Sequence, residues 1–271
     1  MPRPRRLAVV GHVEWVDFVE LARHPRPGEV VHAEKGFARA AGGGGVAAAV
    51  AAELGAEVDF FCALGDDFHG HAADEQLQSR GVTVRVAWRE QPTRRALTLL
   101  EGGGERTIIT IGRRLDPLLS DPLPWERLDR ADGVYFTAGD AAALRRARAA
   151  GVLVASPRAR TALAEPGPGI DALVLSAGDA DEREWASRLG APAELLVLTE
   201  GAAGGRWRSR DGSEGRWDAV TPPGRPRDSY GCGDSFAAGF TFALAGGASP
   251  QQAVAVGAAC GARCLTRAGA P

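Results

Sequence analysis

The sequence predicts an α/β protein with a doubly wound, mostly parallel central sheet and a small β-lid. Short apolar runs alternate with helical stretches along the 271 residues, an order typical of this fold class. The apolar runs are nearly continuous, which indicates strands that helices cover on both faces. No repeat and no long linker divides the chain, so we expect one domain over residues 1–271.

Runs of β-branched and apolar residues predict the strands of the central sheet. They are Leu7–Val10, Val58–Ala63, Val134–Thr137, Val152–Ala155, Ala172–Leu175 and Leu195–Thr199. The predicted helices are Val46–Leu54, His71–Ser79, Ala141–Ala150, Ala180–Leu189, Ser235–Leu244 and Pro250–Leu265. The last helix has a clear start, because Ser249 suits the N-cap, Pro250 the first helical position and Gln252 a capping box.

Two segments interrupt this alternation, Val30–Phe37 and Arg85–Ile111. Both are typical of extended chain, and the glycines at 102–104 predict a hairpin within the second. We interpret the two segments as a small lid sheet beside the main one. The Pro-Gly-Pro-Gly stretch at 166–169 predicts a surface turn.

Composition excludes several classes of protein. The net charge of −2 gives no basic face for nucleic acid. The apolar run after the basic N-terminus is too short for a signal peptide, and no run approaches the ~18 residues of a membrane span. We therefore expect a cytoplasmic protein that binds neither nucleic acid nor membrane. The four cysteines are expected to be reduced thiols.

The segment Gly231-Cys232-Gly233-Asp234 carries the clearest chemistry, and a predicted helix follows it at once. The glycines let the backbone turn tightly and expose its N–H groups. Together with the dipole of the helix, these groups suit a phosphate in transit. Asp234 can orient an acceptor hydroxyl and accept its proton as a phosphoryl group arrives. The plainer alternative is a turn with an N-capping aspartate.

Two other glycine motifs do not fit. A P-loop would need Lys-Ser/Thr after the glycines, and none follows. A dinucleotide fingerprint would follow the first strand, whereas this motif lies near the C-terminus. The glycines at 42–45 alone support an oxidoreductase, and they lack the Gly-x-Gly-x-x-Gly pattern.

The C-terminal segment resembles the signature of the ribokinase-like carbohydrate kinases, also called the phosphofructokinase-B family, with Cys232 in place of a small alanine. Other parts of the chain resemble family motifs in the family's order. They are Ala41–Gly45 with the helix after it, Gly65–Gly70, Gly81-Val82, Gly104–Thr107 in the lid hairpin and Thr199–Gly204. The resemblance implies a ribokinase-like three-layer fold and an ATP-dependent kinase that acts on a sugar or sugar-like molecule.

The resemblance also implies roles for individual residues. Asp234 would be the catalytic base, with Gly231, Cys232 and Gly233 as the anion hole. Thr199, Gly201 and Gly204 would lie at the ATP phosphates. Glu14, Asp17, Gly43, Gly44 and Arg106 would face the acceptor. Asp179 and Asp228 would help to hold Mg²⁺, Asp228 through structure if not by direct ligation. A requirement for a monovalent cation and a homodimer formed through the lid stay open.

Three departures from the family pattern concern the substrate and metal side. Val46 stands where the family has a sugar-binding asparagine, and a valine cannot bond a hydroxyl. One extra residue precedes the first acidic position, so either Glu14 or Asp17 could take that role. Ser176–Asp179 replaces the Asn-x-x-Glu motif, and Ser156-Pro157-Arg158 is what is left of Asp-x-Asn-x-Arg. A nucleoside kinase and a non-catalytic sugar or nucleotide sensor are the alternatives.

Overall fold

Two sheets organise the computed structural model, which describes residues 3–33, 35–101, 106–165, 167, 169–188, 193–269 and 271. The main sheet has nine strands among the described residues, in the order β13-β12-β11-β10-β9-β8-β1-β4-β5. In chain order they are β1 (Arg6–Val10), β4 (Glu57–Gly65), β5 (Val82–Arg89), β8 (Gly133–Phe136), β9 (Leu153–Ala155), β10 (Ile170–Ser176), β11 (Ala193–Thr199), β12 (Gly205–Ser209) and β13 (Glu214–Trp217). All neighbours pair in parallel except β11 with β12 and β12 with β13.

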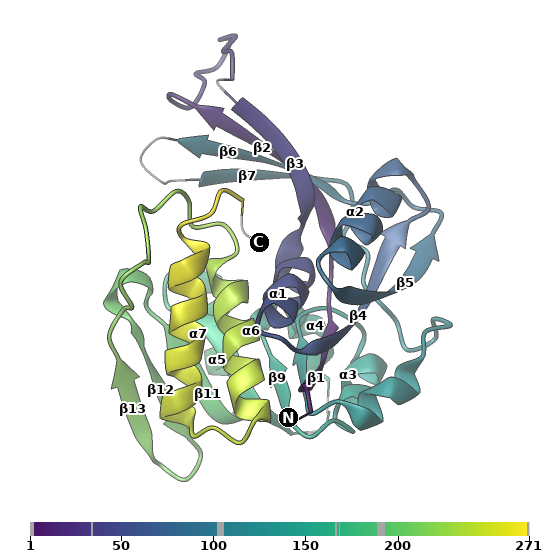
Figure 1. Ribbon diagram of the computed structural model, residues 1–271, viewed down its shortest axis with the longest axis vertical. Coiled ribbons are helices and arrows are strands. Elements are labelled where there is room, and N and C mark those ends of the chain that lie inside the picture. The colour runs from purple at the N-terminus through teal and green to yellow at the C-terminus, as the bar shows by residue number, and fades with distance from the viewer. Residues whose placement is uncertain are drawn as a thin grey trace.

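Helices cover both faces of this sheet, which confirms the predicted three-layer α/β class. They are α1 (Gly42–Glu53), α2 (Phe68–Ser79), α3 (Ala141–Ala147), α4 (Arg160–Leu163), α5 (Ala180–Arg188), α6 (Cys232–Ala245) and α7 (Pro250–Cys264). Short 3-10 turns occur at η1 (Trp125–Arg130), η2 (Pro157–Ala159) and η3 (Gly201–Ala203). In Figure 1, α6 and α7 lie side by side in front of the sheet.

The alternation along each strand separates two apolar cores. On β1, Leu7 and Val9 join the core that includes residues of α1, α6 and α7. Ala8 and Val10 point the other way and pack with residues of α3 and α4. Since successive side chains of a strand point to opposite faces, one buried run supplies both layers.

A smaller sheet of β3-β2-β6-β7 stands beyond one edge of the main body, at the top of Figure 1. Its strands are β2 (Glu14–Leu21), β3 (Lys35–Ala41), β6 (Arg95–Glu101) and β7 (Arg106–Ile111). β2 pairs in parallel with β6 and antiparallel with β3. We call this four-stranded sheet the lid sheet.

The predicted lid was wrong at the start of each of its two segments. Residues 30–33 form no strand, and the chain becomes extended only at β3. Arg85–Arg89 belongs to β5 and pairs with β4 in the main sheet. Glu14–Leu21 supplies a lid strand that was not predicted. The hairpin predicted at 102–104 and part of the turn predicted at 166–169 lie outside the described residues.

The predicted strands and helices of the main body otherwise lie where expected, with shifted ends. α1 begins at Gly42 rather than Val46, because Gly42 to Gly45 are all buried within its first turn. α3 ends at Ala147, three residues before the predicted end. The capping box at Ser249 is confirmed, since the Gln252 N–H bonds the Ser249 hydroxyl and the Gln252 side chain accepts the Ser249 N–H.

Candidate active site

The N-terminus of α6 is where the sequence predicts an anion site. Gly231 adopts a left-handed conformation with φ of 74°, and the helix starts at the next residue without a side-chain cap. By contrast, Asp67, Asp140 and Ser249 cap α2, α3 and α7. The first N–H groups of a helix have no acceptor within it, and a Cβ added to Gly233 would meet nothing within 4 Å. The Cys232 N–H donates to the Ser229 carbonyl at 3.4 Å, whereas the backbone at Gly233 borders open space.

Asp234 lies in the first turn of α6 with only 13 % of its side chain exposed. Its Oδ1 is 3.9 Å from Nε of Arg158, which follows β9 on η2. A Cβ added to Gly43 at the start of α1 would lie 2.9 Å from the same oxygen. The N-termini of α1 and α6 thus meet at the Asp234 carboxylate. The negative charge of this carboxylate raises the pKa of Arg158.

A cavity of about 1130 Å³ opens on one side of Asp234. Nine of the residues singled out in the sequence line it together: Arg106, Asp179, Thr199, Gly201, Gly204, Gly231, Cys232, Gly233 and Asp234. Arg106 comes from the lid strand β7, and the others come from the end of β11, from the segments that follow β10 and β11 and from the start of α6. Open α/β sheets bind ligands at this edge, and the volume suits a nucleotide-sized molecule.

The predicted nucleotide loop follows β11 as a tight turn. The Thr199 hydroxyl donates to the Leu175 carbonyl at 3.3 Å, which ties the ends of β10 and β11 together. Gly204 accepts the Glu200 N–H at 2.8 Å and donates to the Gly201 carbonyl at 3.1 Å. Gly201 and Gly204 have φ of 60° and 82°. Both positions therefore favour glycine.

A second group of residues lies on the Gly43 side of Asp234, and we call it the acceptor floor: His12, Glu14, Gly43, Thr137, Ser156 and Arg158. Added to Gly43, a Cβ would also meet Cε1 of His12 and Oγ1 of Thr137 at 3.3 Å. The Ser156 hydroxyl donates to Thr137 at 3.1 Å. His12, Thr137, Ser156 and Arg158 follow the ends of β1, β8 and β9 at one edge of the main sheet, while Glu14 begins β2 and Gly43 lies in the first turn of α1.

The structure separates the two acidic residues that were left as alternatives. Glu14 is 6 % exposed and lies 3.2 Å from Nε of Arg94. Burial raises its pKa, and Arg94 opposes that rise. Asp17 lies farther along β2 in the lid sheet, pairs with Arg95 at 2.9 Å and keeps 36 % of its side chain exposed. Glu14 therefore lies in the acceptor floor, and Asp17 has a lid partner instead.

Gly43 and Gly44 also differ, although the sequence grouped them. A Cβ on Gly44 would lie 2.7 Å from the His12 carbonyl and 2.8 Å from the Phe60 ring. Gly44 also donates its N–H to that carbonyl at 3.0 Å. Gly44 thus allows α1 to pack closely on the end of β1, and Gly43 alone faces Asp234.

Sequence reasoning missed His12, which is 4 % exposed in the acceptor floor. Its Nε2 accepts the Gly43 N–H at 3.3 Å, so Nδ1 carries the proton of the neutral ring. Nδ1 has no hydrogen-bond partner among the described residues. Burial holds the pKa of His12 well below 6.5, and the charges of Arg158, Arg114 and Arg94 lower it further.

A fall in pH below 6.5 is expected to destabilise the wild type more than His12→Gln. The folded state keeps His12 neutral, while unfolded His12 takes up a proton near its ordinary pKa of 6.5. The stability that neutral His12 contributes is complete above pH 6.5. It is lost as the pH falls from 6.5 to the pKa of the folded state, by at most about 1.4 kcal/mol per pH unit. Melting temperatures of both proteins from pH 7.5 to 5 measure it. Glu14 titrates in the opposite sense in both proteins, so equal pH profiles would contradict this account of His12.

The two predicted metal residues have different surroundings. Both carboxylate oxygens of Asp228, a 2 % exposed residue, accept backbone N–H groups, from Tyr230 at 2.9 Å and Gly269 at 2.8 Å. This pattern fits a structural role in shaping the loop before α6. Asp179 is exposed and accepts the Glu182 N–H at 3.1 Å, which caps α5. The searched residues hold no cluster of three or more metal-binding side chains.

Glu182 was not predicted, and it is the better placed carboxylate. One oxygen accepts the Ser176 N–H at 2.9 Å, at the end of β10, and the residue lines the cavity. Burial raises its pKa, while the charge of Arg158 lowers it. The motif match in the sequence ended at Asp179 and so did not include Glu182. Only the fold shows that Glu182, in the first turn of α5, points back to Ser176 at the end of β10.

The lid sheet reaches the site through Arg106, the first residue of β7, whose guanidinium bonds the Ser229 hydroxyl. Tyr230, next in the chain, accepts the Gly42 N–H at 3.2 Å. The edge of its ring meets Phe18 of the lid strand β2 at a centroid distance of 5.0 Å. The loop before α6 is thus held by the lid sheet and by the start of α1.

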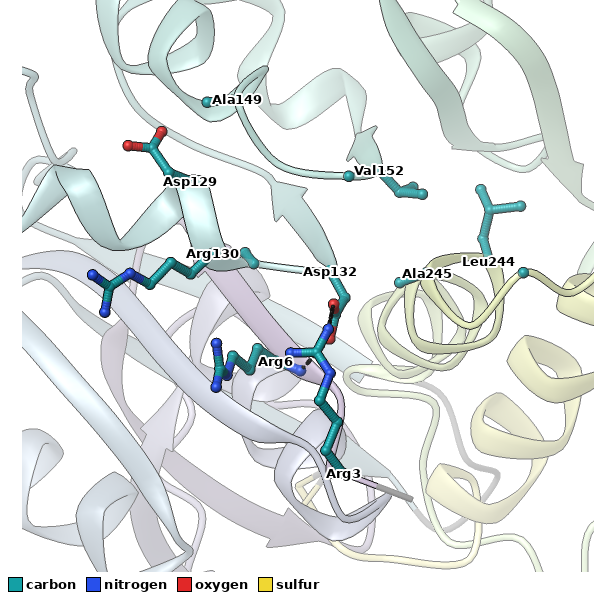
Figure 2. Close-up of a pocket in the computed structure, with 12 residues that line it drawn as sticks. Arg3, Arg6, Asp129, Arg130, Asp132, Ala149, Val152, Leu244 and Ala245 are labelled. Atoms are coloured by element: carbon teal, nitrogen blue, oxygen red, sulfur yellow. Dashed lines mark hydrogen bonds and ion pairs between the residues drawn. The ribbon is translucent and has the colours of Figure 1, made fainter.

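A second cavity, of about 730 Å³, lies at the opposite end of the strands (Figure 2). Arg3 and Arg6 line it, and both bond Asp132: Arg3 with its Nη2 at 2.7 Å and Arg6 with its backbone N–H at 2.9 Å. Ala245 at the far end of α6 also lines it, so roughly 15 Å of helix separates it from Asp234. Both carboxylates of this cavity are already paired, Asp132 with Arg3 and Asp129 with Arg146, and we assign the cavity no ligand.

No helix within the described ranges is long and apolar enough to cross a bilayer. The four cysteines are free thiols, and the Cys264 thiol donates to the Tyr230 carbonyl at 3.2 Å.

Comparisons with known proteins place these features in context. A family model described as pfkB family carbohydrate kinase matches residues 4–271. An ATP-dependent ribose-1-phosphate kinase of Halopiger xanaduensis is 30 % identical over 98 % of this chain and 93 % of its own length. A ribokinase of Arabidopsis thaliana is 26 % identical over 97 % of this chain and 77 % of its own. A solved structure of Arabidopsis thaliana ribokinase, complexed with ribose and ATP, aligns with a TM-score of 0.77 at 22 % identity, and covers 99 % of this chain and 95 % of the other.

Proposed function

Because this chain belongs to the pfkB family of carbohydrate kinases, we propose that it transfers the γ-phosphoryl group of ATP to a hydroxyl of a sugar or sugar-like molecule, with Asp234 as the base. The observation that carries the proposal is the meeting of Asp234, the uncapped start of α6 and Gly43 where a large cavity adjoins the acceptor floor, which shares Ser156 and Arg158 with it. Relatives named as a ribokinase and as an ATP-dependent ribose-1-phosphate kinase support the reaction class.

Asp234 would accept the proton of the acceptor hydroxyl as that oxygen attacks phosphorus. Arg158, whose Nε lies 3.9 Å from Oδ1 of Asp234, would offset negative charge on the transferred group. The N–H groups at the start of α6 would stabilise the developing negative charge without reorganisation, because the helix already fixes them. Gly43 leaves the space in front of Asp234 open for the hydroxyl.

The cavity side would hold ATP, with Thr199, Gly201 and Gly204 at its phosphates. Mg²⁺ prefers oxygen ligands and is usually bound by one or two carboxylates plus substrate phosphates. Glu182 fits this donor set, since one of its oxygens stays free of the bond to Ser176. Mg²⁺ bound there would offset phosphate charge, while the lid sheet would exclude water through contacts such as Arg106 with Ser229.

Glu182→Gln is expected to weaken Mg²⁺-dependent ATP binding by about 10- to 100-fold, the usual effect of losing a metal-site carboxylate. Calorimetric titration of ATP with and without Mg²⁺ measures this without relying on turnover. Asp179→Asn is the matched comparison, and it should have little effect on helix stability or on Mg²⁺ dependence, because asparagine can still accept the Glu182 N–H. The reverse ranking of the two variants would favour Asp179 as the metal ligand.

The assay that tests the function measures ADP release with ATP and Mg²⁺ against pentoses, hexoses, sugar phosphates, sugar acids and nucleosides. Turnover of one class, lost in an Asp234 variant, is the expected result. ATP binding without turnover of any acceptor would favour the non-catalytic sensor, and turnover of nucleosides alone would favour the nucleoside kinase. Val46, which prompted the sensor alternative, is 0 % exposed and packs in the core. It therefore gives no contact to an acceptor.

The homodimer stays a prediction. The lid sheet ends at β7, whose six residues are all exposed, among them Ile108, Ile109 and Ile111.

A further inference from the structure

The start of α6 and the end of α7 carry two neighbouring cysteines. Cys232 is the first residue of α6, and Cys264 is the last residue of α7. The two helices lie side by side (Figure 1) and are joined by residues 246–249 alone, so the start of one lies beside the end of the other. A Cβ added to Gly261, one turn before Cys264, would lie 3.3 Å from the Cys232 carbonyl oxygen.

Hydrogen bonds hold these two helix ends together. The Cys264 thiol donates to the Tyr230 carbonyl at 3.2 Å, and the Arg227 N–H donates to the Leu265 carbonyl at 2.7 Å. The thiols of Cys232 and Cys264 also form a hydrogen bond with each other. A disulfide needs two cysteines whose side chains already face each other, because the bond tolerates only a narrow range of geometry. This pair meets that condition.

The large cavity gives this pair an entrance from solvent. Cys232 is half-buried and lines the cavity, which no other cysteine does among the described residues. Cys62 and Cys260 are buried, and burial raises the pKa of both thiols. In the pair, by contrast, the hydrogen bond from Cys232 lowers the pKa of Cys264. Oxidants react with accessible thiols that have thiolate character, so they should select this pair.

We propose that Cys232 and Cys264 form an oxidation site, at which hydrogen peroxide that enters the cavity converts the two thiols to a disulfide. One sulfur of the pair attacks a peroxide oxygen, the O–O bond breaks, and a sulfenic acid and water form as the leaving oxygen takes the thiol proton. The other sulfur then attacks the sulfenic sulfur, the S–O bond breaks, and the hydroxyl leaves as water with the second thiol proton. The two thiols thus lose two electrons, and the peroxide is reduced to water.

The disulfide inactivates the site at the start of α6; this effect rests on the kinase function proposed above, whereas the formation of the bond does not. A covalent bond draws the two sulfurs closer than a hydrogen bond does, so the first residue of α6 moves toward α7. The N–H groups beside Asp234 then move with it. A displacement of about 1 Å in a catalytic group can cost about 100-fold in rate, and we expect a loss of this size. A dithiol reductant should restore the rate.

Peptide mapping after treatment with hydrogen peroxide tests the bond without relying on turnover. The remaining thiols are alkylated in denaturant, and trypsin should then release peptide 264–267 joined to peptide 228–263, since arginine ends both peptides and precedes both. The larger peptide also contains Cys260, so Cys260→Ala is the matched control and should keep the link. Cys232→Ala and Cys264→Ala should each abolish it. Cys264→Ser replaces Cys264→Ala should the latter fail to fold.

The outcomes separate the oxidation site from the kinase function. Peptides that stay unlinked, or that carry only sulfinic or sulfonic acid at Cys232, would overturn the oxidation site. Turnover that peroxide lowers in the wild type but not in Cys264→Ala would support the effect on transfer. Linked peptides with unchanged turnover would overturn that effect. Linked peptides in a protein that never turns over any acceptor would contradict the kinase and leave the oxidation site standing.

Discussion

Asp234→Asn is expected to lower kcat by about 10²–10⁴-fold, the usual contribution of a general base, with little change in ATP affinity. Asparagine has the shape of aspartate but cannot accept the acceptor proton. Asp234 contacts Gly43 and Arg158 at the boundary between the cavity and the acceptor floor, so its loss should affect transfer more than nucleotide binding. Single-turnover ADP release and calorimetric ATP titration measure the two properties separately.

Glu90→Gln is a suitable control for this variant, since it removes one carboxylate at an exposed position of the chain. It should retain the wild-type kcat. Should Asp234→Asn keep the wild-type turnover as well, another group must accept the proton, and the proposed mechanism would be wrong at its central step.

Gly204→Ala is expected to have the largest effect on stability among the site residues. The added Cβ would lie 2.0 Å from the Trp217 carbonyl oxygen and 2.8 Å from the Asp218 carbonyl carbon, both of them backbone atoms that cannot rotate away. Its φ of 82° and ψ of −112° also lie outside the regions that alanine adopts readily. Strain and overpacking together should cost about 2–5 kcal/mol. Urea denaturation measures this loss.

Gly201→Ala in the same loop provides the comparison. Gly201 has φ of 60°, in the left-handed region, but an added Cβ would meet nothing within 4 Å. Only the backbone preference is lost, so we expect about 1 kcal/mol. ATP affinity should fall in Gly204→Ala, because the Gly204 carbonyl accepts the Glu200 N–H that closes the nucleotide loop. Equal stability of both variants would show that the loop yields freely to the clash.

The predictions that the structure confirmed concern local patterns. The strands β1, β4, β8, β9 and β10 are mostly buried on both faces, so each is an apolar run in the sequence whatever its partner. The edge strands β12 and β13 are largely exposed and were not predicted. The predicted start of α1 was wrong because glycine has a low helix propensity. At Gly43 and Gly44, contact with Asp234, His12 and Phe60 leaves no room for a side chain, so tertiary packing overrides that propensity.

The lid strands and the charged groups around the site depend on contacts distant in sequence. β2 pairs Trp15 with Arg95, eighty residues later, and no local signal shows which segment it will join. No local signal predicts the contact of Arg94 with Glu14 either, because the two residues are far apart in the sequence. The roles of Asp234 and of the loop glycines stay predictions from motif and geometry together.

The register of the lid sheet has a thermodynamic consequence. Glu14, the first residue of β2, pairs with Ala41, the last residue of β3, and Gly42 follows at once as the start of α1. No loop separates the lid sheet from the start of α1, where Gly43 lies against Asp234. A change in the position of the lid sheet would therefore also move this part of the site. If the acceptor and ATP both favour the same lid position, the binding of one raises the affinity for the other. By linkage the two factors are equal: the acceptor changes the ATP affinity as much as ATP changes the acceptor affinity.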